Sequence, residues 1–431
     1  MKKKLILIEL NEINFDILKK YSIYKNFKFF NKELLKNLRT TSSETVYENL
    51  EPWIQWVSIH TGLSASEHKI FRLGDINNSN LKQIFETVEA NGYQVSAICP
   101  MNTKNNLKKS KYFIPDPWTK TSKPKNIFQN IIYTTLSEAV NDNSKNKLSI
   151  KNKIIIFFLS LYFFKGKSLF TFIKYYFKSI RLKWYRAIIF DYLLHKIHIS
   201  YLKKFDIDFS TIFFNAGAHI QHHYLHNSKV IEGEVDKNPN WYVHEKYDPI
   251  LDVYSFYDEI LSDYIKNDHS ILIATGLTQN PFIEKEYYYR LKNHQSFIKN
   301  LKINFKSIYP RMSRDFLITF RSHNDCLKAS KVFEYINEIN KIKFFDYEIR
   351  ENSIFVIFCY NKRIDENLEM KIDINYSINL YESVNFVALK NGDHNQKGYL
   401  TSFGEFKNFM PPENSHVKEL FYSINNFFGK K

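Results

Sequence analysis

The sequence is poor in cysteine, proline and glycine. Its 431 residues include 3 cysteines, 11 prolines and 11 glycines. The cysteines, Cys99, Cys326 and Cys359, are widely spaced. This spacing excludes a disulfide framework and a zinc ribbon, and it indicates a reducing, cytoplasmic compartment.

Apolar runs long enough to cross a bilayer are also missing. The start Met1-Lys2-Lys3-Lys4 is basic, but the apolar run after it, Leu5 to Leu10, contains Glu9 and leads into Asn11-Glu12 rather than a small-residue cleavage site. We therefore predict a buried strand there and no signal peptide. Ile154 to Phe164 is almost wholly apolar but has only 11 residues, whereas a membrane span needs about twenty.

What the sequence has in abundance is lysine and aromatic residues. The net charge is +16, and hydrophobic and aromatic residues make up 44% and 17% of the chain. This composition excludes a disordered protein. Lysine is abundant together with Asn, Ile, Phe and Tyr, as expected of an AT-rich bacterial genome. Nucleic-acid binding rests on the charge alone, without a recognised reader motif, and is not favoured.

Short apolar runs alternate with segments of helical period, which predicts an α/β fold with a mostly parallel central sheet and helices on both faces. We assign residues 1–120, 205–300 and 385–431 to this core. Leu5 to Leu10 is expected to be a central strand, and Phe386 to Leu389 is expected to re-enter the same sheet. Because ligands bind beyond the carboxyl ends of such strands, Glu9, Asn11 and Glu12 are candidate site residues. Asn11 or Asn14 could instead cap the next helix.

Two segments depart from this alternation of apolar runs and helical segments. Residues 120–204 form a basic, aromatic, amphipathic helical insert, in which Lys151, Lys153, Lys165 and Lys167 flank the apolar run. Such an insert can lie on an anionic membrane surface, or it can be a helical cap with a lysine-rich solvent face. Residues 301–384 alternate strands and a helix and predict a small α+β subdomain.

A histidine-rich stretch follows the predicted strand Phe209 to Phe214. His219, His222, His223 and His226 fall on one face if the segment is helical. Neutral imidazoles at this spacing suit a transition metal. The alternative is the start of an amphipathic helix whose rings hydrogen-bond locally.

The order of these pieces resembles the alkaline phosphatase superfamily, in its type I phosphodiesterase/nucleotide pyrophosphatase branch. The resemblance covers roughly residues 4–100, 205–280 and 385–405. Ile8 to Asp16 is similar to the family's first strand, with Asn11 where an Asp metal ligand would stand. Trp53 to His68 resembles the helix behind the family's Ser/Thr nucleophile. The remaining matches are His222 to the Asp-x-x-x-His motif, Ala274-Thr275-Gly276 to Ser-Asp-His, and His394, before Gly398, to the last metal-binding His.

The departures from the family pattern argue against its two-metal phosphodiesterase mechanism. Asn11, Ala218 and Thr275-Gly276 stand where the family has Asp, Asp and Asp-His, and the nucleophile position falls near Glu51-Pro52, which has no hydroxyl. Two metals need several carboxylates to offset their charge. The resemblance leaves His222 and His394 for one zinc-like divalent ion, with His219 or Asp393 as a third ligand.

A metal-free pocket is the alternative, with Glu9, Glu12 or Glu51 as general base and histidines binding an anionic group. Under either alternative the candidate catalytic residues are Glu9 and Glu51. The candidate substrate-binding residues are Asn11, Glu12, His60, His219 and Thr275.

Two functions follow from this pattern. The first is a divergent transferase or hydrolase with a rebuilt pocket. Its substrate would be phosphorylated or glycosyl, and lipid-linked as in surface-polysaccharide assembly, at the inner membrane face. The second is a catalytically inactive relative that serves as a binding or scaffolding protein. Convergence of Glu9, Asn11, Glu51, His222 and His394 in one place would favour the enzyme.

Overall fold

The computed structural model describes residues 3–119, 121, 123–141, 149–231, 235–266, 268–311 and 314–429. Residues 120, 122 and 142–148 of the predicted insert, 232–234 and 267 of the predicted core, and 312–313 of the predicted subdomain lie outside these ranges. The chain forms two compact units. Unit 1 takes in the described residues of Met1–Ala139, Ser149–Ile283 and Asn391–Lys431, and unit 2 those of Val140–Leu148 and Glu284–Lys390.

Unit 1 is built on an eight-stranded sheet with the order β18-β2-β17-β6-β1-β5-β3-β4. Strand β1 lies in its interior and pairs in parallel with β5 and β6. Only β17 runs antiparallel to its neighbours, β6 and β2. The sheet confirms the predicted fold class and the central place of the first strand. The strands are β1 (Leu5–Leu10), β2 (Arg39–Ser42), β3 (Val95–Ile98), β4 (Phe113–Ile114), β5 (Phe209–Phe214), β6 (Ser270–Ala274), β17 (Lys397–Phe403) and β18 (Ser415–His416).

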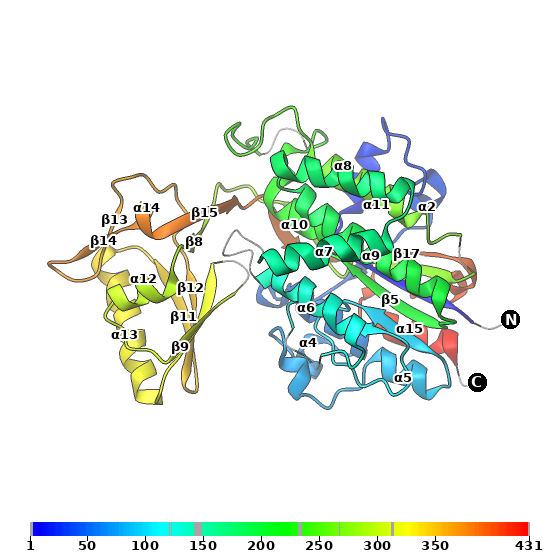
Figure 1. Ribbon diagram of the computed structural model, residues 1–431, viewed down its shortest axis with the longest axis horizontal. Coiled ribbons are helices and arrows are strands. Elements are labelled where there is room, and N and C mark those ends of the chain that lie inside the picture. Colours follow the sequence, from blue (N-terminus) through cyan, green and yellow to red (C-terminus); the bar gives the residue numbers. More distant parts are fainter. Residues whose placement is uncertain are drawn as a thin grey trace. The chain divides into compact units, whose positions relative to one another are not determined.

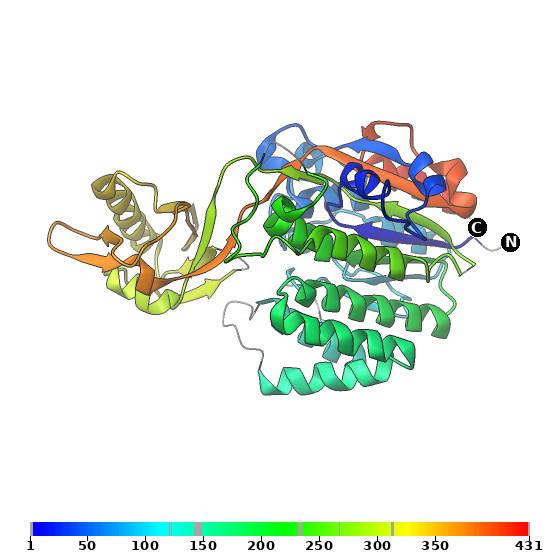
Figure 2. The same ribbon diagram turned by 90° about the horizontal axis from the view of Figure 1, so that it is seen from above.

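Helices cover both faces of this sheet (Figures 1 and 2). In one group, α15 contacts both α3 and α5; in the other, α9, α10 and α11 contact one another. The strands are buried on both faces, which is why β1 and β5 are apolar almost throughout. The helices are α1 (Phe15–Tyr21), α2 (Lys32–Lys36), α3 (Pro52–Thr61), α4 (Ala65–His68), α5 (Ile84–Ala90), α10 (Ala216–Tyr224), α11 (Pro249–Leu261) and α15 (Glu419–Phe428).

The predicted insert is helical, with α6 (Ile127–Asn141), α7 (Ile150–Phe163), α8 (Lys167–Arg181) and α9 (Tyr185–Lys204). Helix α9 contacts β5, α10 and α11, while α7 and α8 pack on α9. The helices α7 and α8 therefore form an outer layer, farther from the sheet than α9 (Figure 2). Within the described residues, none of the helices combines the length and the apolar character that a membrane crossing requires.

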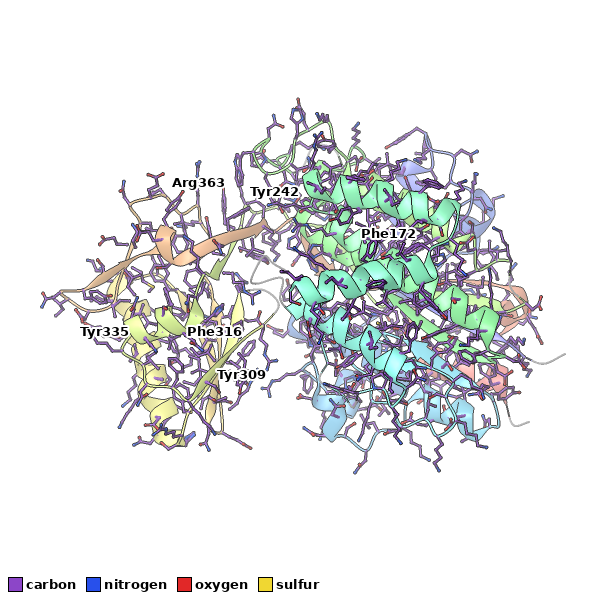
Figure 3. All side chains as sticks on the ribbon, viewed as in Figure 1. Phe172, Tyr242, Tyr309, Phe316, Tyr335 and Arg363 are labelled. Atoms are coloured by element: carbon purple, nitrogen blue, oxygen red, sulfur yellow. The ribbon has the colours of Figure 1, made fainter. Side chains whose placement is uncertain are left out.

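Unit 2 has its own core around an antiparallel sheet with the order β11-β12-β10-β9. Phe316 of β10, labelled in Figure 3, is fully buried in this core. The elements are β8 (Tyr287–Leu291), α12 (His294–Asn300), β9 (Ser307–Pro310), β10 (Asp315–Thr319), α13 (His323–Asn340), β11 (Phe345–Arg350), β12 (Ser353–Phe358), β13 (Glu369–Lys371), β14 (Ser377–Asn379), α14 (Leu380–Ser383) and β15 (Val384–Leu389).

The prediction that Phe386 to Leu389 re-enters the main sheet is wrong. This segment belongs to β15, which pairs with β8 in unit 2, and Phe386 and Val387 are 37% and 43% exposed. The strand that joins the main sheet is β17. Between them, β16 (Gly392–Asn395) pairs with β7 (Thr278–Pro281) as a two-stranded ribbon of unit 1. This ribbon carries Gln279 and His394.

Candidate metal centre

The turn after β1 brings Glu12 to the carboxyl end of the sheet. Glu12 has a backbone φ of 59°, which lies in the left-handed region. This conformation is unfavourable for residues other than glycine. Two neighbours hold it there. Its backbone N–H donates to the carbonyl of Thr275 after β6 (3.1 Å), and its carbonyl accepts from the Gln221 side chain of α10 (2.7 Å).

Two histidines meet the Glu12 carboxylate at this point. Glu12 Oε2 lies 3.1 Å from His222 Nε2 and 3.2 Å from His394 Nε2. The two Nε2 atoms are 3.3 Å apart. His222 comes from α10 and His394 from β16. Within the described part of the chain, these residues are the group of three or more His, Cys, Asp or Glu that could hold a metal ion.

The separations of these atoms fit a single ion. Zinc bonds of about 2.0–2.1 Å in a tetrahedral arrangement place neighbouring ligand atoms roughly 3.3 Å apart. The three distances among Glu12, His222 and His394 are 3.1, 3.2 and 3.3 Å. Two imidazoles and one carboxylate leave one position of a tetrahedron open, as in catalytic zinc sites.

The outer nitrogens of both rings also have partners of the kind that metal-bound histidines have. His222 Nδ1 lies 3.4 Å from the carbonyl oxygen of Gly392. His394 Nδ1 lies 3.7 Å from Glu51 Oε2. A carbonyl or carboxylate behind a ligating imidazole fixes the ring and its tautomer. Glu51 precedes α3, whose first residue is Pro52.

The charges of this cluster are strongly coupled. Burial disfavours the charged form of His394, yet the carboxylates of Glu12, Glu51 and Asp393 raise its pKa to about 9. Burial also opposes ionisation of Glu12, but His394 and His222 hold the pKa of its carboxyl well below the ordinary value. Without a metal, His394 therefore carries a proton and forms an ion pair with Glu12. A metal ion would have to displace that proton.

Gln279 contacts Glu12 and was not among the candidates from the sequence, whereas Asn11 was. The Gln279 amide of β7 donates to Glu12 Oε2 and to the carbonyl of Ala218. Asn11 donates to Glu12 Oε1 (2.9 Å) and to Asn215 Oδ1 (2.8 Å), while its Oδ1 accepts from Trp56 Nε1 (2.8 Å). Gln279 lies five residues past the end of β6, and this position beyond the carboxyl end of a strand could have identified it as a site residue.

The predicted residues do not all meet at this centre. Asn11, Glu12, Glu51, His222 and His394 do. Glu9 and His60 instead bond to each other at 2.9 Å, and both are almost wholly buried (0% and 1% exposed). The Thr275 hydroxyl, also buried, accepts the backbone N–H of Tyr399.

His219 and Asp393 lie beside the centre and have other contacts. The ring of His219 is exposed and lies 4.7 Å, centroid to centroid, from His223. Asp393 accepts a hydrogen bond from the Tyr47 hydroxyl. The third atom of the group that could hold an ion belongs to Glu12, where the sequence suggested His219 or Asp393.

A buried serine–histidine pair lies in the same region but is not arranged as a nucleophile. His68 Nδ1 accepts the backbone N–H of Ile70, so the ring proton is on Nε2, which lies 3.1 Å from Ser58 Oγ. His68 thus donates to Ser58 and cannot accept its proton. Burial lowers the pKa of His68 to about 4, which keeps this tautomer neutral.

Comparison with known proteins gives matches among solved structures only. No family model and no curated protein matches the chain. The murine ectonucleotide pyrophosphatase/phosphodiesterase 5 is 10% identical, with 100% of this chain and 96% of that chain covered and a TM-score of 0.44. Phosphonoacetate hydrolase from Sinorhizobium meliloti, solved with phosphonoformate, is 10% identical, with 99% and 96% covered and a TM-score of 0.41. Alkaline phosphatase from the Antarctic bacterium TAB5 is 9% identical, with 99% and 98% covered and a TM-score of 0.40.

Proposed function

We propose that this protein is a divergent enzyme that binds one zinc-like divalent ion and acts on a phosphorylated or glycosyl substrate. The observation that carries the proposal is the cluster of Glu12 Oε2, His222 Nε2 and His394 Nε2, with the Glu51 carboxylate behind His394. A carboxylate and two imidazoles with an open fourth position suit catalysis better than structural support.

The ion, Glu51 and His219 would have separate roles in the reaction. When bound, the ion would offset negative charge on a phosphoryl oxygen of the substrate. Glu51, which is 33% exposed, would accept a proton from water or from an acceptor hydroxyl. The exposed His219, one turn before His222, would contact an anionic part of the substrate. Glu9 has no such access, because it is buried against His60.

A single ion is proposed because the cluster holds one buried carboxylate. Glu12 is 2% exposed, and the neighbouring side chain, Asn11, is a neutral amide already bonded to Trp56 and Asn215. A second divalent ion would lack a second carboxylate beside Glu12, because Glu51 lies behind His394 and Asp393 accepts from Tyr47. The ordinary two-metal phosphodiester mechanism is therefore not proposed.

The substrate is proposed to be lipid-linked, as in the assembly of a surface polysaccharide. Such a substrate is presented at a bilayer, so an enzyme that uses it must reach the membrane from the cytoplasm. A peripheral location at the inner membrane face is thus part of this proposal.

A catalytically inactive binding protein is the second candidate, and one observation favours it. The residue before α3 is Glu51 and the next is Pro52. A hydroxyl nucleophile is thus missing at the position where the resembled family has one. A site of this kind could bind a phosphorylated ligand without turning it over.

Metal content and turnover together test the proposal. Elemental analysis of the purified full chain should give one equivalent of zinc or a similar ion. Phosphomonoesters, phosphodiesters and nucleotide sugars should then be screened with the wild type and with Glu51→Gln. Turnover that Glu51→Gln abolishes while metal stays bound supports the enzyme. Binding without turnover supports the second candidate, and two equivalents of metal contradict the single-ion site.

A further inference from the structure

The outer helices α7 and α8 expose an unusual amount of apolar surface. Phe157 and Phe158 of α7 are 59% and 63% exposed, and Phe177 of α8 is 64% exposed. Large aromatic side chains are rarely left in water in such numbers on one part of a monomer. The exposed apolar side chains of the two helices are Ile150, Ile154, Phe157, Phe158, Leu161, Tyr162, Phe170, Ile173, Tyr176, Phe177 and Ile180.

These side chains are spaced as faces of helices. On α8, the exposed Phe170, Ile173, Phe177 and Ile180 recur every third or fourth residue. The opposite side of α8 is already used for packing: Phe172, labelled in Figure 3, stacks on Phe164 at 4.6 Å between centroids. The helix thus has one apolar face against the protein and a second apolar face toward the outside.

The two helices are neighbours with the same supporting element. Helix α7 ends at Phe163 and α8 begins at Lys167, and both pack on α9. They form the outer layer of unit 1 (Figure 2). We call the exposed apolar and basic side chains of α7 and α8 the outer face.

The charged side chains of α7 and α8 themselves are all basic, while the carboxylates of Glu138 and Glu259 reach these helices at Asn152 and Tyr175. From Ile150 to Phe190 there are nine lysines and arginines and no aspartate or glutamate, against a net charge of +16 for the whole chain. Lys151, Lys153 and Lys174 are exposed beside the apolar side chains. Long basic side chains beside exposed aromatic rings match the polar and apolar layers of an anionic bilayer surface.

We infer that the outer face of α7 and α8 binds the surface of a bilayer that contains anionic lipid. The helices would lie in the interface and not cross it, since α7 and α8 have 14 and 15 residues. A second copy of the chain fits this face less well. In a symmetric dimer, each outer face would set its basic residues against those of its partner, with no acidic residue of α7 or α8 to offset them.

Vesicle flotation tests the inference without any catalytic assay, so its result is independent of the proposed enzyme. The purified full chain is mixed with phosphatidylcholine vesicles with or without phosphatidylglycerol. We expect it to float with the phosphatidylglycerol vesicles and to be released by salt. Each exposed lysine near an anionic surface contributes about five-fold to binding at low salt. The triple variant Lys151→Gln/Lys153→Gln/Lys174→Gln should therefore bind about 100-fold more weakly.

Matched variants separate this face from general charge and hydrophobicity. Lys20→Gln/Lys82→Gln/Lys108→Gln removes the same charge from exposed lysines elsewhere in unit 1 and should float like the wild type. Phe157→Asn/Phe158→Asn/Phe177→Asn should lose binding, whereas Ile23→Asn/Phe71→Asn/Ile283→Asn, also at exposed positions, should not.

Circular dichroism of every variant shows that the fold is retained. Equal flotation with both kinds of vesicle, or with neither, would overturn the inference. Equal losses in the two lysine variants would also overturn it, because overall charge would then explain the binding. A dimer that only the phenylalanine variant dissociates would assign the face to a second copy.

Discussion

Removal of one imidazole from the metal centre should remove most of the stabilisation that zinc gives. The perturbation is His222→Ala, and the matched control is His219→Ala. Both histidines lie on α10, but only His222 approaches Glu12, at 3.1 Å, while His219 is exposed and contacts His223. Neither substitution introduces a charge, and both remove the same ring from the same helix.

The expected magnitude follows from the number of ligands. Structural zinc sites bind with about 10–16 kcal/mol over four ligands, or roughly 3–4 kcal/mol per ligand. Losing one ligand should therefore weaken zinc binding about 100- to 1,000-fold. At a zinc concentration of about 1,000 times the wild-type Kd, the wild type gains about 4 kcal/mol and the variant about 0.4–1.4 kcal/mol.

Thermal unfolding with and without zinc measures this difference. At about 1 °C per kcal/mol for a chain of this size, zinc should raise the Tm of the wild type and of His219→Ala by about 4 °C. The Tm of His222→Ala should rise by only about 0.5–1.5 °C. A zinc-dependent rise that is the same in all three proteins would refute the assignment of His222 as a ligand. If only His219→Ala lost the zinc-dependent rise in Tm, the ion would be bound by His219 and not by His222.

Three further outcomes are expected. Glu51→Gln should abolish turnover but lower metal affinity by no more than about 10- to 100-fold, because Glu51 contacts the ligand His394 and not the ion. Isothermal titration with zinc measures the affinity. Asn11→Asp should destabilise the metal-free protein by about 1–3 kcal/mol, because a second carboxylate would face the Glu12 carboxylate and the side-chain oxygen Oδ1 of Asn215. Denaturant unfolding with and without zinc should show that the ion restores part of this stability. Burial raises the pKa of Asp191 to about 7 from its ordinary 3.8, so the native state binds this proton more tightly than the unfolded state. Its contribution therefore makes stability fall as pH rises from about 4 to 7, and Asp191→Asn should remove that part of the pH dependence of Tm.

Local pattern predicted those parts of the structure that depend on burial alone. Leu5–Leu10 reads as a buried strand because the sheet covers both of its faces, and it is the strand between β5 and β6. The stretch after Phe214 reads as a helix with histidines on one face because their spacing follows the helical period. For that reason the helix α10 was expected from the sequence, whereas His222 was singled out from the other histidines by the family resemblance.

Contacts between residues that lie far apart in the sequence could not be predicted in the same way. Glu12 meets His222 and His394 because its φ of 59° turns the carboxylate toward them, and hydrogen bonds to Thr275 and Gln221 hold that turn. The residues next to Glu12 in the sequence do not indicate this turn. Likewise, four apolar residues from Phe386 to Leu389 indicate a strand but not its partner, which is β8 of unit 2.

The ribbon of β7 and β16 has a consequence for how the protein is made. Unit 2 interrupts the chain between these two strands, so His394 joins Glu12 only after Glu284–Lys390 has been synthesised. The ion pair between Asp16 and Lys397 closes a loop of the same kind, with a sequence separation of 381 residues. Contacts between such distant segments form late, because loop closure costs entropy before the contact stabilises the fold. A nascent chain that ends before β16 therefore holds Glu12 and His222 without their partner, and the candidate metal centre is completed only after β16 has been synthesised.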